Sequence, residues 1–156
     1  MDTLERNLTI FEAHCLHNHH EFEVYDFTDF AYGERIVRTM DGQHFALLTI
    51  DDPVVKETER LLDEIFNGEL DEIERAERFD QVFGFTCDQL NGEQLDASVR
   101  IVCPICKTLQ VSHRDFVPPR FKSFSIPVIA HEGWSNLTRD QRRQLIEKGL
   151  RFKGLL

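Results

Sequence analysis

The chain has 156 residues, 13 of them phenylalanine, which is the size of one ordinary domain with enough apolar side chains for a core that needs no disulfides. Its formal net charge of -10 argues against nonspecific binding to nucleic acid, because phosphate contacts require lysine and arginine. The first residues are charged and no long apolar run occurs, so we expect no secretory signal, no membrane span and a cytoplasmic protein.

The first elements are predicted to be β-hairpins. Residues 8–27 read as two strands around a histidine-rich turn, because β-branched and aromatic residues lie on both sides of that turn. Residues 34–40 and 44–50 form the next pair of apolar runs, and Asp41-Gly42 between them is a strong hairpin signal.

The apolar period then changes to that of helices over residues 52–84. Asp52 is placed to cap the first helix and Pro53 to occupy its first turn, while Asn67-Gly68 ends it. A second helix follows, with its apolar face formed by Leu70, Ile73, Ala76, Phe79 and Phe83. Residues 51–80 hold 12 acidic and 4 basic side chains, so we expect an acidic helical hairpin packed on a sheet.

The last third returns to extended structure and ends in a helix. Residues 98–113 read as strand, knuckle and strand, and Pro118-Pro119 is expected to break the second strand. Residues 121–130 can form a strand, which Pro127 limits to the edge of a sheet. Thr138 and Gln141 form a capping box for a helix over 138–149, with Gly149 as its stop. These elements predict an α+β fold and a single domain over residues 1–156.

A metal site is indicated by Cys103-Pro104-Ile105-Cys106. Two thiols separated by two residues are the usual way in which one turn offers half of a tetrahedral shell. The alternatives are unligated thiols or a redox pair, but a thioredoxin-like pair is expected at the start of a helix, and strand residues follow here. The segment resembles the Cys-Pro-x-Cys knuckle of zinc-ribbon proteins. That resemblance implies one structural Zn²⁺ between two hairpin tips and a role in binding rather than in catalysis.

The second half of the site is expected at the first hairpin tip, since the chain has no second Cys-x-x-Cys. Aligning Cys15 with Cys103 places Asn18 opposite Cys106, and asparagine is a poor zinc ligand. A neighbouring imidazole must then replace it, and we predict His19, with His17 and His20 as alternatives. In a further register, His17 and His20 are the ligand pair and Cys15 is only a buried thiol. Cys87 is a possible ligand, although its apolar surroundings favour a buried small side chain.

A catalytic role finds little support in the sequence. It lacks a His-Glu-x-x-His helix, the zinc-deaminase pattern, a phosphate-binding glycine loop and a Gly-x-Ser-x-Gly elbow. Glu21 and Glu23 follow the histidines, which keeps a metal-dependent hydrolase as the third hypothesis. His131 and Trp134 are candidates to line a pocket, but packing of this aromatic beside a helix start is the commoner outcome.

Two hypotheses on binding remain. In the first, the protein is a non-catalytic adaptor or inhibitor whose acidic helices meet a basic protein partner. In the second, it is a nucleic-acid-associated zinc-ribbon protein. Residues 1–106 carry 24 acidic and 8 basic side chains, but residues 107–156 carry 4 and 10. The candidate basic residues are Arg114, Arg120, Lys122, Arg142, Arg143, Arg151 and Lys153.

Overall fold

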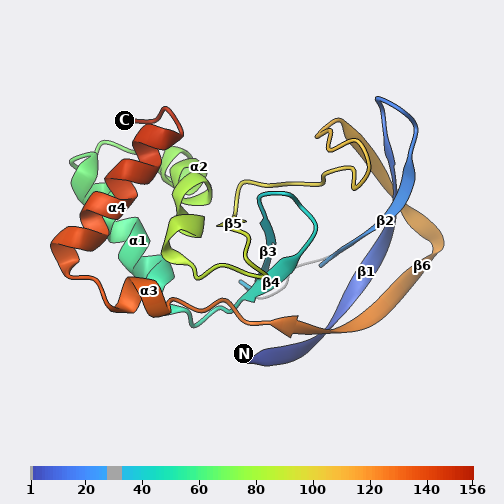
Figure 1. Cartoon of the computed structure of the whole chain (residues 1–156), viewed down its shortest axis with the longest axis horizontal. Helices are drawn as coiled ribbons and strands as arrows, with labels where there is room; N and C mark the ends of the chain where they lie inside the picture. Colours follow the sequence, from blue (N-terminus) through green and yellow to red (C-terminus); the bar gives the residue numbers. More distant parts are fainter. Residues whose placement is uncertain (1, 28–32) are drawn as a thin grey trace. The chain divides into compact units, whose positions relative to one another are not determined.

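The computed structural model describes residues 2–27 and 33–156 and confirms the α+β class (Figure 1). The chain divides into two compact units. Unit 1 comprises residues 1–50 and 99–128, and unit 2 comprises residues 51–98 and 129–156. The single domain expected over residues 1–156 stays a prediction. Among the described residues, no helix is long and apolar enough to cross a lipid bilayer.

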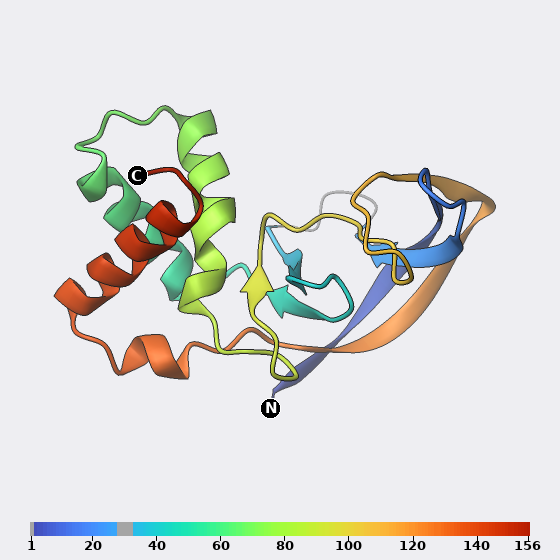
Figure 2. The same cartoon turned by 45° about the horizontal axis from the view of Figure 1, so that its top comes forward.

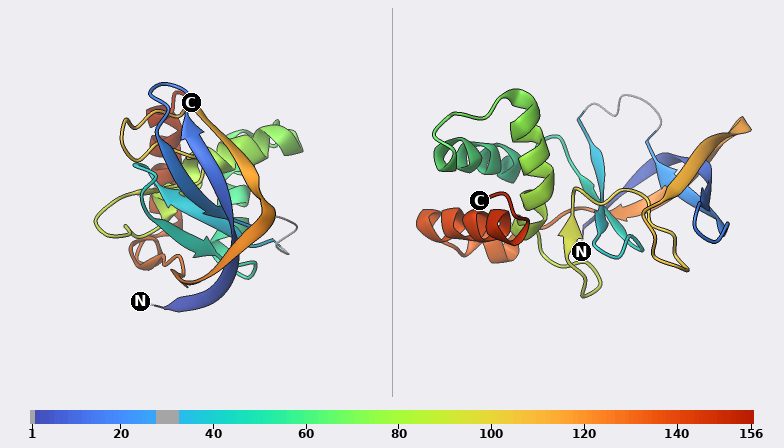
Figure 3. Two further views of the ribbon diagram at one scale, coloured as in Figure 1. Left: turned by 90° about the vertical axis from the view of Figure 1, so that its right-hand side faces the viewer. Right: turned by 90° about the horizontal axis from the view of Figure 1, so that it is seen from above.

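Unit 1 contains a three-stranded antiparallel sheet in the order β2-β1-β6. Its strands are β1 (Thr3–Cys15), β2 (Glu21–Asp26) and β6 (Val111–Pro127), and the long β1 and β6 form the curved ribbon in Figure 3. β1 therefore begins earlier than the predicted hairpin of residues 8–27. Because β6 lies at one border of this sheet, the edge position expected for Pro127 is confirmed.

The second hairpin of unit 1 was correctly predicted. β3 (Arg35–Thr39) pairs with β4 (Phe45–Leu48) in antiparallel register around Asp41-Gly42. Leu8, Ile36, Leu47 and Ile126 form the buried cluster that joins this hairpin to the larger sheet. Burial of these apolar side chains is the main force that holds the two β elements together.

Two strand predictions were wrong. Residues 99–110 contain no strand, so the second knuckle is not the tip of a 98–113 hairpin; β6 pairs instead with β1. Pro118-Pro119 also fails to end the strand. The register changes from Ile10 opposite Arg120 to Phe11 opposite Asp115, so residues 116–119 bulge out of the ladder. The prolines, which lack an N–H donor, thus lie where no ladder bond is required.

Unit 2 is built around three helices that pack on one another (Figure 2). α1 (Pro53–Ile65) is capped by Asp52, which accepts from Val54 N–H, as predicted. α2 (Glu72–Val82) leads into the short 3₁₀ helix η1 (Phe83–Thr86) and the two-residue strand β5 (Leu95–Asp96). α3 (Glu132–Ser135) and α4 (Arg139–Phe152) complete the unit. The helical pair thus packs against α4.

Two details of these helices differ from the prediction. Ile73 and Ala76 were assigned to the buried face of α2, but Ile73 is 72% exposed and Ala76 is exposed. Phe79, Val82 and Phe83 supply the buried side. The expected end of α4 at Gly149 is also wrong.

The end of α4 is set by a different glycine. The Thr138 capping box starts the helix as predicted, but Gly149 lies inside it, where a Cβ would come within 2.7 Å of the Phe85 ring. Gly154 has φ +73° and the N–H of Leu155 bonds to the carbonyl of Leu150, which is the usual glycine-based termination.

Candidate metal centre

Two short turns of unit 1 bring three cysteines and one histidine together. The first knuckle, residues 15–20, joins β1 to β2, and the second knuckle, residues 103–108, precedes β6. The β1–β6 ladder pairs Cys15 with Val111, and Leu16 N–H continues it to the carbonyl of Gln110. Pairing of these two strands therefore holds the knuckles side by side.

The knuckles have the same backbone hydrogen bonds. Cys15 N–H donates to the carbonyl of His20 and His19 N–H to that of Cys15, at 2.9 Å each. In the second knuckle, Cys103 N–H donates to Thr108 and Lys107 N–H to Cys103, at 3.0 Å each. The alignment of Cys15 with Cys103 is therefore the one the structure adopts.

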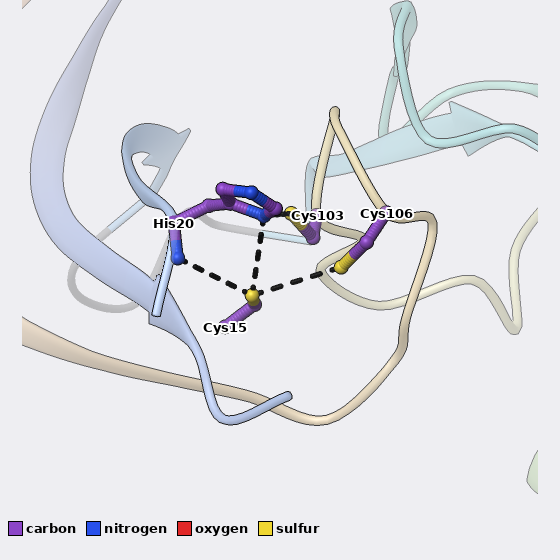
Figure 4. A group of neighbouring side chains, drawn as sticks. All are labelled: Cys15, His20, Cys103 and Cys106. Atoms are coloured by element: carbon purple, nitrogen blue, oxygen red, sulfur yellow. Dashed lines mark hydrogen bonds between the residues drawn. The ribbon is translucent and has the colours of Figure 1, made fainter. Parts of the chain in front are cut away.

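Four side chains converge between these turns (Figure 4): Cys15, His20, Cys103 and Cys106, called here the knuckle cluster. Their donor atoms all lie within 4.8 Å of one another. Nδ1 of His20 is 3.5 Å from Sγ of Cys15 and 3.6 Å from Sγ of Cys103, and the sulfurs of Cys15 and Cys106 are 3.6 Å apart.

The three distances just given are close to the edges of a metal tetrahedron. With metal bonds of about 2.3 Å to sulfur and about 2.0 Å to nitrogen, tetrahedral geometry places two sulfurs about 3.8 Å apart and a sulfur and a nitrogen about 3.5 Å apart. The four donor atoms therefore lie close enough together to hold one metal ion.

Backbone N–H groups favour the thiolate forms of Cys15 and Cys103. Those of Asn18 and His20 lie 3.3 and 3.4 Å from Sγ of Cys15. Burial alone would raise the pKa of Cys15, but these donors and the neighbouring thiols lower it to about 6. Burial also opposes ionisation of Cys103, but the backbone N–H groups of Cys106 and Ile105 favour it. The pKa of Cys103 is lowered overall. Thiolate is the form that ligates metal.

His19 was the preferred histidine and His20 an alternate, and the structure places His20, not His19, in the knuckle cluster. His19 occupies the position of Lys107 in the second knuckle, and both have positive φ, 57° and 63°. The donor comes from the next residue, His20, whose side chain is longer than that of cysteine and brings Nδ1 to the sulfurs of Cys15 and Cys103. His17 is not part of the knuckle cluster. The register with His17 and His20 as the pair and Cys15 as a spectator is thus not the one adopted.

Cys87 belongs to unit 2 and is not a member of the knuckle cluster. Its thiol is buried and donates to the carbonyl of Phe83 at 3.5 Å, and burial raises its pKa to about 12. It therefore behaves as a small apolar side chain, as its sequence context favoured.

His131 and Trp134 pack within unit 2. The indole of Trp134 is 3% exposed and donates to Glu57, while His131 bonds to Asp52 at 2.7 Å and to the carbonyl of Thr86 at 2.8 Å. This buried ion pair was not anticipated, since nothing in the sequence relates residues 79 positions apart.

No protein-family model matches the chain, and no curated protein or solved structure shows significant similarity to it. The likeness to zinc ribbons therefore rests on the residues of the knuckles alone.

Proposed function

We propose that this is a non-catalytic protein in which Cys15, His20, Cys103 and Cys106 hold one structural Zn²⁺. The observation that carries the proposal is the convergence of their four donor atoms, which all lie within 4.8 Å of one another. Three thiols and an imidazole suit zinc better than magnesium or calcium, which prefer oxygen. A catalytic zinc keeps a position open for water, whereas four protein donors complete the shell. This counts against the hydrolase hypothesis.

Metal stoichiometry on protein purified without a histidine tag tests the zinc assignment. We expect one zinc per chain, lost in Cys103→Ser and in Cys15→Ser. Cys87→Ser is the matched control and should keep its zinc. Full zinc content in Cys15→Ser would show that the ligands lie elsewhere. The requirement for reduced thiols fits a cytoplasmic location, which is part of the proposal.

We propose that the role of the protein is to bind a basic protein partner through the outer face of α2. Glu72, Ile73, Ala76 and Glu77 lie on this face, at the spacing of one helical stripe, and all are exposed. The exposed side chain of Ile73 can make an apolar contact with a partner, and Glu72 and Glu77 surround that contact with negative charge. Unit 2 as a whole carries 18 acidic and 10 basic side chains, so its field attracts a cation-rich surface.

Charge reversal tests the α2 face. Proteins that co-purify with the zinc-loaded chain should be lost in the double variant Glu72→Lys/Glu77→Lys and retained in Glu93→Lys, an exposed acid of the same unit outside α2. The partner should have a basic contact surface and dissociate as salt rises, since screening weakens such contacts. A partner that is equally retained by the double variant would contradict the proposal.

The nucleic-acid hypothesis is the weaker one, because most of the candidate basic side chains face carboxylates in their own unit. These pairs are Arg114–Glu12, Arg120–Glu23, Arg142–Glu57, Arg143–Glu147, Arg151–Glu147 and Lys153–Asp96. Paired cations release fewer counterions from phosphate. A gel-shift titration of labelled DNA and RNA at physiological salt should therefore show no complex.

A further inference from the structure

Unit 1 contains a cavity of about 180 Å³ that the proposed functions do not use. Its walls come from β2, from the β3–β4 hairpin and from residues 101–104, which lead into the second knuckle. The apolar part is lined by Phe22, Val24, Phe45, Ile101, Val102 and Pro104. A concave apolar site with a few polar groups is the usual form of a ligand pocket.

One of these polar groups is the guanidinium of Arg38, which is only 12% exposed. Its Nη2 donates to the carbonyl of Tyr25 at 2.9 Å, and Oδ2 of Asp26 lies at 3.7 Å, beyond a good hydrogen bond. Within residues 2–27 and 33–156, its Nε and Nη1 have no hydrogen-bond acceptor. Burial lowers the pKa of Arg38, but a guanidinium stays charged in proteins. Arg38 also lines the cavity, and a guanidinium that faces a cavity fits an anion that takes two parallel N–H bonds.

The free edge of β2 is the second polar feature of the cavity. Cys15 N–H donates to the carbonyl of His20, and the same register pairs Ala13 with Phe22 and Phe11 with Val24. Since hydrogen-bonded pairs alternate in antiparallel strands, the N–H and C=O groups of Glu23 and Tyr25 point away from β1. The bond from Arg38 to the Tyr25 carbonyl agrees with this. Among the described residues no strand pairs with this edge of β2, so Glu23, which also lines the cavity, can pair with another extended chain.

The charges around Arg38 limit the anion. The carboxylate of Asp26 lies 3.7 Å from Arg38, and Glu23 lines the same cavity. The negative charge of Glu23 is only partly neutralised by Arg120, at 3.5 Å. These two carboxylates would repel a phosphate with two negative charges more than a carboxylate with one. A carboxylate also matches the planar fork of the guanidinium.

We propose that this cavity binds the carboxyl-terminal end of an extended polypeptide whose last side chain is apolar. The terminal carboxylate accepts from Nη1 and from the second N–H of Nη2, which together form the outer fork of the Arg38 guanidinium. The main chain before it pairs with the open edge of β2 at Glu23, as in recognition by strand addition. The last side chain enters the apolar part of the cavity beside Phe22 and Phe45. This binding site is separate from the metal site and from the α2 face. The proposal holds whether or not either of them binds a partner.

The test is an NMR titration of the zinc-loaded, ¹⁵N-labelled full chain with the peptide acetyl-Ala-Ala-Ala-Ala-Leu. We expect saturable shifts of the amides of Glu23, Gly42 and Gln43, with a dissociation constant on the order of 0.1–1 mM for so small a contact. The same peptide with a C-terminal amide should bind at least about tenfold more weakly, because it has no charge for Arg38.

Variants localise the effect. Arg38→Lys should weaken binding about tenfold, since an ammonium group cannot make the bidentate contact, and Arg38→Gln should abolish it. Arg114→Lys, at an exposed arginine of β6 in the same unit, is the control and should bind like the wild type. Unchanged zinc content and amide dispersion would show that each variant is folded.

Three outcomes would overturn the proposal: no shift at saturating peptide, equal binding of the amidated peptide, or equal binding by Arg38→Gln. Hexanoate separates the possible sources of an apolar carboxylate. We expect it to bind at least about tenfold more weakly than the peptide, because it cannot pair with the β2 edge. Equal affinity for hexanoate would mean that a free acid, and not a chain end, is recognised.

Discussion

His19 and Lys107 occupy the same place in the two knuckles, and both have the left-handed backbone conformation, with φ 57° and 63°. The N–H of this residue donates to the carbonyl of the first cysteine of its knuckle, Cys15 for His19 and Cys103 for Lys107. The second knuckle supplies its second donor one residue before that position, at Cys106, and the first knuckle supplies it one residue after, at His20. The two halves of the knuckle cluster are therefore alike in backbone but not in the place of the ligand.

This relationship predicts which histidine the metal needs. His20→Ala should weaken zinc binding about a hundredfold, because one of four donors accounts for about 3 kcal/mol of a total on the order of 12 kcal/mol. His19→Ala and His17→Ala should bind zinc like the wild type. Competition with a chromophoric chelator measures all three. Strong loss in His19→Ala with none in His20→Ala would restore the histidine first expected.

Removal of the metal should unfold unit 1 and leave unit 2 intact. All four cluster residues belong to unit 1, whereas unit 2 has its own core around Leu61, Leu62, Phe83, Ile146 and Leu150. Trp134 is the single tryptophan and lies in unit 2, so its emission reports on that unit alone. After chelation, amide signals of β1 and β6 should collapse while Trp134 emission stays unchanged. A simultaneous red shift of Trp134 would instead support one cooperative domain.

Thiol alkylation should separate Cys87 from the other cysteines. In chelated protein, N-ethylmaleimide is expected to modify Cys15, Cys103 and Cys106 at neutral pH and to spare Cys87, whose thiol is buried with a pKa raised to about 12. Peptide mapping by mass spectrometry locates the modified residues. Zinc-loaded protein serves as the control and should resist modification at all four sites. Rapid labelling of Cys87 in chelated protein would show that unit 2 opens when the metal leaves.

The ion pair of His131 with Asp52 should make unit 2 less stable as pH rises. Burial by itself lowers the pKa of His131, but its bonds to Asp52 and Thr86 raise it overall. Both ring nitrogens face acceptors, so the imidazolium is the bound form. A raised folded-state pKa contributes stability below the ordinary value of about 6.5, which is lost as pH rises through the raised pKa.

Urea unfolding followed by Trp134 emission measures this dependence. His131→Gln should lower the free energy of unfolding by about 1–3 kcal/mol at acid pH and should flatten the loss at higher pH. His44→Gln, at an exposed histidine of unit 1, is the control and should behave like the wild type. A stability that rises with pH above 6 in the wild type but not in His131→Gln would reverse the assigned sign.

Gly149→Ala should destabilise unit 2, although alanine normally favours a helix by about 0.5–1 kcal/mol. The added Cβ would lie 2.7 Å from Cδ2 of Phe85, and overpacking of this kind costs about 1–3 kcal/mol. Thermal unfolding measures the loss. In a Phe85→Ala background the same change should become neutral or stabilising, because the clash is removed. Destabilisation that persists in that background would point to another cause.

The sequence determined those features that depend on neighbours within a few residues. Asp52 with Pro53 starts α1, Thr138 with Gln141 starts α4, and Asp41-Gly42 turns β3 into β4. Each of these is a hydrogen bond or a backbone preference within one turn, so the residues themselves decide it. The Cys-Pro-x-Cys spacing likewise predicted half of the knuckle cluster.

Tertiary structure alone decided where the other partners lie. His20 meets Cys103 across 83 positions of sequence and Cys15 meets Cys106 across 91, and no local pattern encodes which of several adjacent histidines reaches a sulfur. The same holds for α2, where periodicity placed both Ile73 and Phe79 inside, but packing against the other helices of unit 2 buries only Phe79. Burial on a helix is chosen by what packs against it. The sequence thus named the donors of the metal site, and the pairing of β1 with β6 chose among them.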